Sequence, residues 1–98
     1  MDKEMKLDDV EEVMLDFELD TKTNLGKSKF NNFDFEVKLR PFMGVMGMPP
    51  NEEGRYSTVV PRYCGGNIDC KELVAGSTLY LPIPVDGALF SVGDGHAL

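Results

Sequence analysis

Alternation of apolar and polar residues predicts two strands in the first part of the chain. Residues 13–20 have an apolar side chain at every second position, from Val13 to Leu19, which is the period of a strand with one solvent-facing side. Residues 33–40 alternate more cleanly, with four apolar side chains on one face and four charged ones on the other. We therefore expect strands over residues 13–20 and 33–40.

The segments around these two strands are less regular. Apolar residues from Leu7 to Phe17 also recur at spacings of three to four, so an amphipathic helix competes with the first strand. Residues 1–12 are polar enough to remain a loose N-terminal segment. The link formed by residues 21–32 is rich in Lys, Asn, Thr and Ser, a composition typical of a loop or an exposed hairpin connection.

The composition changes abruptly in the middle of the chain. Residues 41–50, which follow Arg40, carry no charge and contain repeated Gly and Pro. No regular element is therefore expected there. We expect this segment to pack under another element or to line a pocket, and core filling by adaptable Met side chains is the alternative. Residues 51–56 indicate a polar turn, and residues 57–60 a short extended piece stopped by Pro61.

The C-terminal third is predicted to form a hairpin. Residues 78–84 and 88–92 both alternate, and the Asp-Gly pair at residues 86–87 is a typical turn between them. Pro82 and Pro84 lack N–H donors on the same lateral side of the first strand, so we expect an edge or a bulge there.

The expected fold is all-β. Short amphipathic strands alternate with Gly/Pro-rich loops, and residues 69–74 are suited to one short helical turn. This pattern favours a β-sandwich or jelly-roll-like fragment. The 98 residues are expected to form a single partial domain.

Charge and composition narrow the classes of function. Seventeen acidic residues against ten basic ones give a net charge of -7, which disfavours nucleic acid and anionic membranes as partners. The charge-free stretches are too short to span a bilayer. The first residues lack the apolar run of a secretory signal, so the expected location is the cytoplasm. Cys64 and Cys70 match no disulfide framework and are expected to be free thiols.

Two segments next to glycines hold the candidate chemistry. Asp94 and His96 are two residues apart, so an extended backbone places both on one face, where they can reach one metal ion. Asn67 and Asp69 follow a Gly-Gly pair. A purely structural interpretation is open as well, because such residues commonly bond nearby amides in turns and His96 lies near a chain end, where fraying is common.

Several common catalytic patterns are missing from the sequence. It has no G-x-S-x-G, H-E-x-x-H or Walker A motif. His96 is the only histidine, and no spacing supports a Ser-His-Asp triad around it. Cys64 or Cys70 with His96 as the base is conceivable, but nothing marks either sulfur as lying in electropositive surroundings.

Three blocks of the sequence carry a resemblance to a known family. They are LRPFMGVMG at 39–47, GGNIDCKELVAGSTLYLP at 65–82 and GALFSVGDGHA at 87–97. In this order they resemble the acetamidase/formamidase family of small-amide hydrolases, and they cover nearly everything after Leu39. Residues 1–38 match only in strand pattern.

The resemblance implies an enzyme that hydrolyses formamide, acetamide or similar short linear amides to ammonia and the acid. It also implies a β-sandwich and a divalent metal ion, with zinc or calcium as candidates. Asp69, Asp94 and His96 would be metal ligands or water-activating groups, and Asn67 would be an orienting hydrogen-bond partner. A metal-activated water beside a carboxylate supplies both the nucleophile and the charge relief that amide hydrolysis needs, and a carboxylic acid or His96 would protonate the departing ammonia.

The chain also departs from the family. Family members are several times longer, and this chain resembles their middle third, ending before an expected Gln-Gly-Asp-Gly-Glu block that would bring a further acidic ligand. We therefore expect a truncated amidase with an incomplete site and exposed strand edges, features that favour a homo-oligomer. The alternative is a catalytically inactive β-rich fragment that acts only as a structural or oligomerising module.

Overall fold

The computed structural model describes residues 10–98. Within these residues it contains six short strands and no helix, so the all-β prediction is confirmed. The strands fall into two compact units, one ending at Lys38 and the other beginning at Leu39. The second unit therefore begins where the first family-like block begins.

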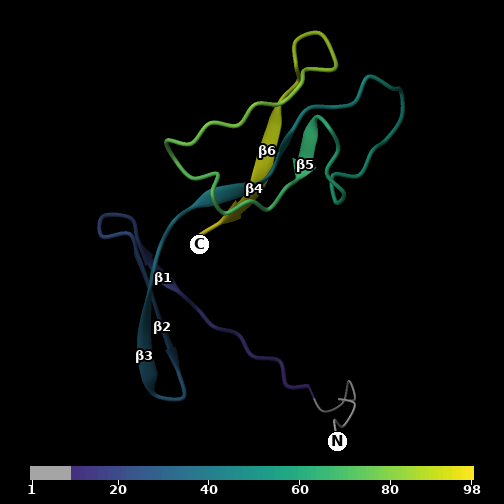
Figure 1. Ribbon diagram of the computed structural model, residues 1–98. Coiled ribbons are helices and arrows are strands. Elements are labelled where there is room, and N and C mark those ends of the chain that lie inside the picture. Colours follow the sequence, from purple (N-terminus) through teal and green to yellow (C-terminus); the bar gives the residue numbers. More distant parts are fainter. Residues whose placement is uncertain (1–9) are drawn as a thin grey trace, which may run out of the picture. The chain divides into compact units, whose positions relative to one another are not determined.

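A three-stranded antiparallel meander forms the first unit (Figure 1). Its strands are β1 (Glu18–Asp20), β2 (Leu25–Phe30) and β3 (Phe33–Lys38). The β2–β3 hairpin turns at Asn31 and Asn32, whose φ values of 47° and 62° are typical of a two-residue turn with both central residues left-handed. The ring of Phe17 meets that of Phe35 edge-on, with 5.8 Å between centroids.

The predictions for this unit are partly confirmed. The strand expected over residues 33–40 is present as β3. The strand expected over residues 13–20 is limited to β1, and residues 10–17 form neither a strand nor the competing helix. The parts of the helix and loose-segment predictions that fall on residues 1–9 lie outside the described residues.

The loop or exposed hairpin connection predicted over residues 21–32 is wrong, because this segment contains β2, the central strand of the meander. β2 pairs with β1 on one side and β3 on the other. Backbone hydrogen bonds on both sides hold this strand, and its sequence, LGKSKF, has too little apolar alternation to reveal it. The Asn-Asn turn was the available signal, since Asn tolerates positive φ.

The second unit contains a three-stranded antiparallel sheet with the order β5-β4-β6 (Figure 1). Its strands are β4 (Phe42–Gly47), β5 (Gly65–Asn67) and β6 (Ser91–His96). β4 lies in the centre and pairs with both neighbours. Segments far apart in the sequence therefore meet on the two sides of one strand.

The prediction of no regular element over residues 41–50 is wrong, because this segment contains β4. A short uncharged run is consistent with a buried strand, and its glycines let neighbouring backbone and side chains approach closely. The expected pocket lining is confirmed. Phe42, Met43 and Met46 line a cavity of about 740 Å³ within this unit.

The C-terminal hairpin is also corrected. Residues 78–84 form no strand, and β6 begins only at Ser91 and pairs with β4. The two prolines of residues 78–84 remove ladder donors, and Ala88 and Leu89 have φ values of 60° and 53°, which are incompatible with a continuous strand. The turn at residues 86–87 is present, with the Ala88 N–H donating to the Val85 carbonyl at 3.1 Å.

Two shorter predictions also change. Residues 57–60 include bends rather than a regular extended piece. Residues 69–74 contain a single turn, closed by the Leu73 N–H on the Cys70 carbonyl at 3.0 Å, and no helix.

The hydrophobic core of the described residues is small. Its buried members are Leu39, Phe42 and Cys64, all in the second unit. Within residues 10–98, the structure has no helix of the length and apolar character needed to cross a membrane.

Candidate metal centre

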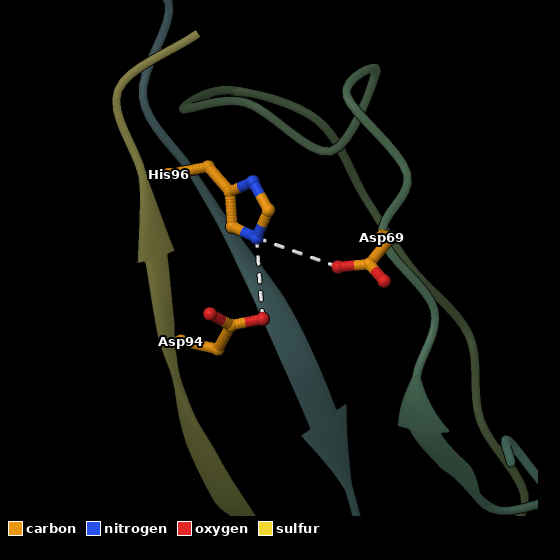
Figure 2. Close-up of side chains that lie close together, drawn as sticks. All are labelled: Asp69, Asp94 and His96. Carbon is orange, nitrogen blue, oxygen red and sulfur yellow. Dashed lines mark hydrogen bonds and ion pairs between the residues drawn. The ribbon is translucent and has the colours of Figure 1, made fainter. Parts of the chain in front are cut away.

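Asp69, Asp94 and His96 converge in the second unit (Figure 2). His96 Nε2 lies 3.2 Å from Asp94 Oδ2 and 3.4 Å from Asp69 Oδ1. One nitrogen or oxygen atom from each residue lies within 4.8 Å of the other two. The three residues that the sequence singled out as metal ligands are therefore neighbours in space.

β6 supplies two of the three side chains. Its register with β4 pairs Met43 with Gly95 and Val45 with Gly93, and it skips the pair between Gly44 and Asp94. Asp94 has a φ of 55°, so its backbone is left-handed rather than extended. Even so, its carboxylate lies beside the imidazole of His96, as the two-residue spacing predicted.

The third side chain comes from the loop after β5. The N–H groups of Ile68 and Asp69 both donate to the Gly44 carbonyl, at 2.9 and 3.1 Å. Asp69 has a φ of 51°, and this turn directs the chain away from the strand. Two backbone hydrogen bonds thus fix the Asp69 loop to the middle of β4.

An aromatic contact orients the imidazole of His96. His96 is the register partner of Phe42 in β4, and the two rings are stacked with 4.6 Å between centroids and 27° between planes. Phe42 is buried, which limits the movement of the ring beneath His96. The stacking leaves Nε2 directed at the two carboxylates (Figure 2).

Gly44 lies beneath the point where the three side chains converge. A Cβ atom built on Gly44 would be 2.5 Å from Asp94 Oδ2, 2.6 Å from Asp69 Oδ1 and 2.7 Å from His96 Nε2. The three candidate ligand atoms therefore surround one small space that a side chain would fill.

The chemistry and spacing of these atoms fit a divalent ion. Zinc bonds carboxylate oxygens and imidazole nitrogens at about 2.0–2.2 Å, so two atoms bound to one zinc ion are at most about 4.4 Å apart. The separations of 3.2 and 3.4 Å between His96 and the two carboxylates satisfy this limit, and the two carboxylate oxygens lie within 4.8 Å of each other. Two carboxylates and one imidazole are also a common donor set for divalent ions.

The charge at the site favours a cation. The side chains of Asp69 and Asp94 are 47% and 51% exposed. Among the described residues, no Lys or Arg nitrogen lies within 4.0 Å of either carboxylate, and the basic side chain beside them is His96. A divalent ion would neutralise both charges while remaining accessible to solvent and small molecules.

Asn67, the fourth candidate residue, lies outside this cluster. Its side-chain Nδ2 donates to the Val59 carbonyl at 3.4 Å, and its backbone N–H donates to the Thr58 carbonyl at 2.8 Å. In the structure Asn67 holds the segment at residues 58–59 against β5.

The cysteines show no pairing with His96. Cys64 is buried and Cys70 is half-buried, and both are free, as predicted. The Cys70 thiol donates to Glu72 Oε2 at 3.3 Å, and this hydrogen bond is the main cause that lowers the pKa of the Glu72 carboxyl.

Sequence reasoning missed Phe42 and Gly44. Both occur in the uncharged segment that was predicted to have no regular structure. Neither residue has a side chain that can ligate a metal, so a search for ligands passes over them. The signal that could have found them is register, since Phe42 pairs with His96, and Gly44 lies between the partners of Gly95 and Gly93, once β4 and β6 pair.

Comparison with known proteins gives a match to one family over part of the chain. The family model described as "Acetamidase/Formamidase family" matches residues 51–98. Through this segment the chain is similar to the acetamidase/formamidase family. An acetamidase of Mycolicibacterium smegmatis is 49% identical over 39 residues, which are 40% of this chain and 10% of that relative. No solved structure matches the chain.

The match to the family model includes all three clustered side chains. Asp69, Asp94 and His96 lie within residues 51–98, whereas β4, with Phe42 and Gly44, lies outside the matched range. The chain spans about a tenth of the curated relative.

Proposed function

We propose that the site formed by Asp69, Asp94 and His96 belongs to a metal-assisted hydrolase of short linear amides such as formamide and acetamide. The observation that supports this most is the convergence of two carboxylates and one imidazole on the space above Gly44. The similarity of residues 51–98 to an amidase family supports this class of reaction.

The three candidate ligands would hold the ion, and the carboxylates would also transfer the proton. A bound divalent ion would supply Lewis-acid chemistry, polarising the amide carbonyl and acidifying a nearby water. Asp69 Oδ1, Asp94 Oδ2 and His96 Nε2 would hold the ion. The second oxygen of either carboxylate would accept a proton from the attacking water and return it to the leaving nitrogen, which departs as ammonia.

The remaining contacts orient these groups. Phe42 keeps the imidazole plane fixed, and the Gly44 carbonyl holds the Asp69 loop in place. The half-exposed carboxylates leave room for a small amide to approach. Between the two candidate ions, the imidazole donor favours zinc, because calcium sites are built from oxygen ligands.

A hybrid enzyme tests the proposal. Residues 51–98 would replace the corresponding segment of the M. smegmatis acetamidase, and ammonia release from acetamide and formamide would be measured. We expect activity that a chelator removes and a divalent ion restores. In the hybrid, Asp94→Asn should lower kcat/KM by more than about 100-fold, as expected for loss of a ligand.

Asp86→Asn is the matched control, because Asp86 is exposed in a turn and does not belong to the cluster. We expect it to change kcat/KM by less than about 3-fold, as is usual for a surface substitution. Activity that persists in the presence of chelator, or an equal loss in both Asn variants, would contradict the proposal.

A second candidate function is an oligomerising β-rich module without catalysis. It is favoured by large apolar side chains on the surface, among them Tyr80 at 90% and Ile83 at 66% exposure. Such exposure promotes association. Sedimentation velocity should then show the weight-average mass of the chain rising with concentration, and Tyr80→Ser with Ile83→Ser should reduce this rise. A monomer at all concentrations rules this candidate out.

A further inference from the structure

Gly44 is a glycine that the backbone conformation does not require. Gly65 and Gly66 have φ values of 101° and 137°, which side chains rarely adopt, whereas the φ of Gly44 lies outside this left-handed range. An alanine at position 44 would therefore be compatible with the backbone. The reason for glycine at this position must lie in the space above it.

The atoms around that space are the ends of side chains. At Gly47 an added Cβ would meet backbone atoms of the neighbouring segment at 2.8–2.9 Å, which is a close approach between strands. At Gly44 the added Cβ would meet the two carboxylates and the imidazole of the site. Those side chains are between 35% and 51% exposed, so they have room to turn toward solvent.

Because the atoms around Gly44 belong to movable side chains, a side chain at this position should affect ion binding more than folding. A methyl group at position 44 can be accommodated if Asp69, Asp94 and His96 move apart. Such movement leaves the backbone of β4 unchanged, but it removes the shared space that the three ligand atoms surround. The position is therefore tolerant for folding and intolerant for binding an ion.

We propose that Gly44 is a positioning residue of the metal site, and the proposal rests on the function proposed above. Because Gly44 has no side chain, the space that the ion would occupy stays open. The Gly44 carbonyl also fixes the loop of Asp69 by accepting hydrogen bonds from the N–H groups of Ile68 and Asp69. β4 therefore contributes to the metal site without supplying a ligand.

Metal titration of the full chain tests this role. Calorimetry with Zn²⁺ would compare the wild type with Gly44→Ala, and with Gly93→Ala as the control. Gly93 is also a strand glycine outside the left-handed range, and a Cβ there would have no atom within 4 Å. We expect Gly44→Ala to weaken Zn²⁺ binding by more than about 100-fold, at least the loss seen for supporting residues of metal sites, and Gly93→Ala by less than about 3-fold.

A second measurement separates a lost site from a lost fold. Without metal, both variants should keep the thermal midpoint of the wild type within a few degrees. The amides of Ile68 and Asp69 should keep their protection from hydrogen exchange in both. This result would show that the methyl group blocks the space for the ion and leaves the two hydrogen bonds to the carbonyl of residue 44 intact.

The other outcomes overturn the proposal in distinguishable ways. Zn²⁺ binding by Gly44→Ala within about 3-fold of wild type would leave the metal site standing and remove the role of Gly44. Unfolding of Gly44→Ala alone would show that the three side chains cannot move aside, so the glycine serves packing. Absence of Zn²⁺ binding to the wild type would refute the metal site itself, and the inference with it.

Discussion

At the residue scale, two candidate ligands share an uncommon backbone conformation. Asp69 and Asp94 have φ values of 51° and 55°, and aspartate is enriched among non-glycine residues in this region. Sparsely populated conformations of this kind cluster at functional sites. The residue types at positions 69 and 94 therefore suit both the local turn and the binding of a cation. Sequence reasoning identified Asp94 from its type and its spacing from His96, with an extended backbone expected there, and identified Asp69 as a ligand through the family resemblance.

Asp20 provides a prediction at the same scale. Its Oδ1 accepts hydrogen bonds from the N–H groups of Lys22 and Thr23, at 2.9 and 3.2 Å, and these bonds lower the pKa of its carboxyl from the ordinary 3.8. A lowered pKa means that the carboxylate stabilises the turn above the unfolded pKa. That stabilisation is lost as the pH falls through the folded pKa.

We therefore expect the Lys22 and Thr23 amide resonances to shift together as the pH is lowered below about 3.8. Asp20→Ala should abolish this transition. Asp16→Ala is the control, since Asp16 accepts a hydrogen bond from Ser28 Oγ through its backbone carbonyl, which the substitution keeps. A transition that persists in Asp20→Ala would assign the effect to another group.

At the element scale, β4 organises the second unit. It pairs with β5 and β6, supports the imidazole through Phe42 and leaves the space above Gly44. Its sequence, FMGVMG, shows no alternation of apolar and polar residues. The strand is held by backbone pairing with β5 and β6 on its two sides, not by the burial of one apolar face. This is why a search for period two found β3 but missed β4.

Gly47 provides a prediction for this element. A Cβ at Gly47 would lie 2.8 Å from the Gly66 nitrogen and 2.9 Å from the Cys64 carbonyl oxygen. Backbone atoms cannot turn aside as side chains can, so Gly47→Ala should force β5 away from β4. We expect a loss of about 1–3 kcal/mol in the free energy of unfolding, the usual range for overpacking.

Denaturant unfolding of the two alanine variants would measure this loss. Gly93→Ala serves as the control, because a Cβ there would enter open space. If Gly47→Ala loses no more stability than Gly93→Ala, the close approach between β4 and β5 is not a constraint on the sheet.

At the scale of the whole molecule, the site lies entirely within one of the two units. Asp69, Asp94, His96, Phe42 and Gly44 all belong to the unit that begins at Leu39. The meander of β1, β2 and β3 contributes no residue to the cluster. We therefore expect residues 39–98 alone to contain everything that the ion contacts within the described part of the chain.

The prediction is that a chain of residues 39–98 binds Zn²⁺ with the affinity of the full chain, within about 3-fold, since distant changes usually have small effects. Calorimetric titration of both chains under the same conditions would measure this. A loss of 10-fold or more, about 1.4 kcal/mol, with the shorter chain folded, would show that the first unit supports the site.

The sequence by itself determined the all-β class, the strand of residues 33–40, the turn at residues 86–87 and the three clustered side chains. The strands and the turn follow from local information, namely alternation and turn-forming residues. The two-residue spacing linked Asp94 with His96, and the family resemblance added Asp69. The tertiary structure decided that residues 21–32 and 41–50 contain central strands and that residues 78–84 do not form a strand. It also brought Asp69 to Asp94 and placed Gly44 beneath both. The physical reason is that strand pairing depends on backbone hydrogen bonds and close approach between distant segments, and neither leaves a periodic pattern within a single segment.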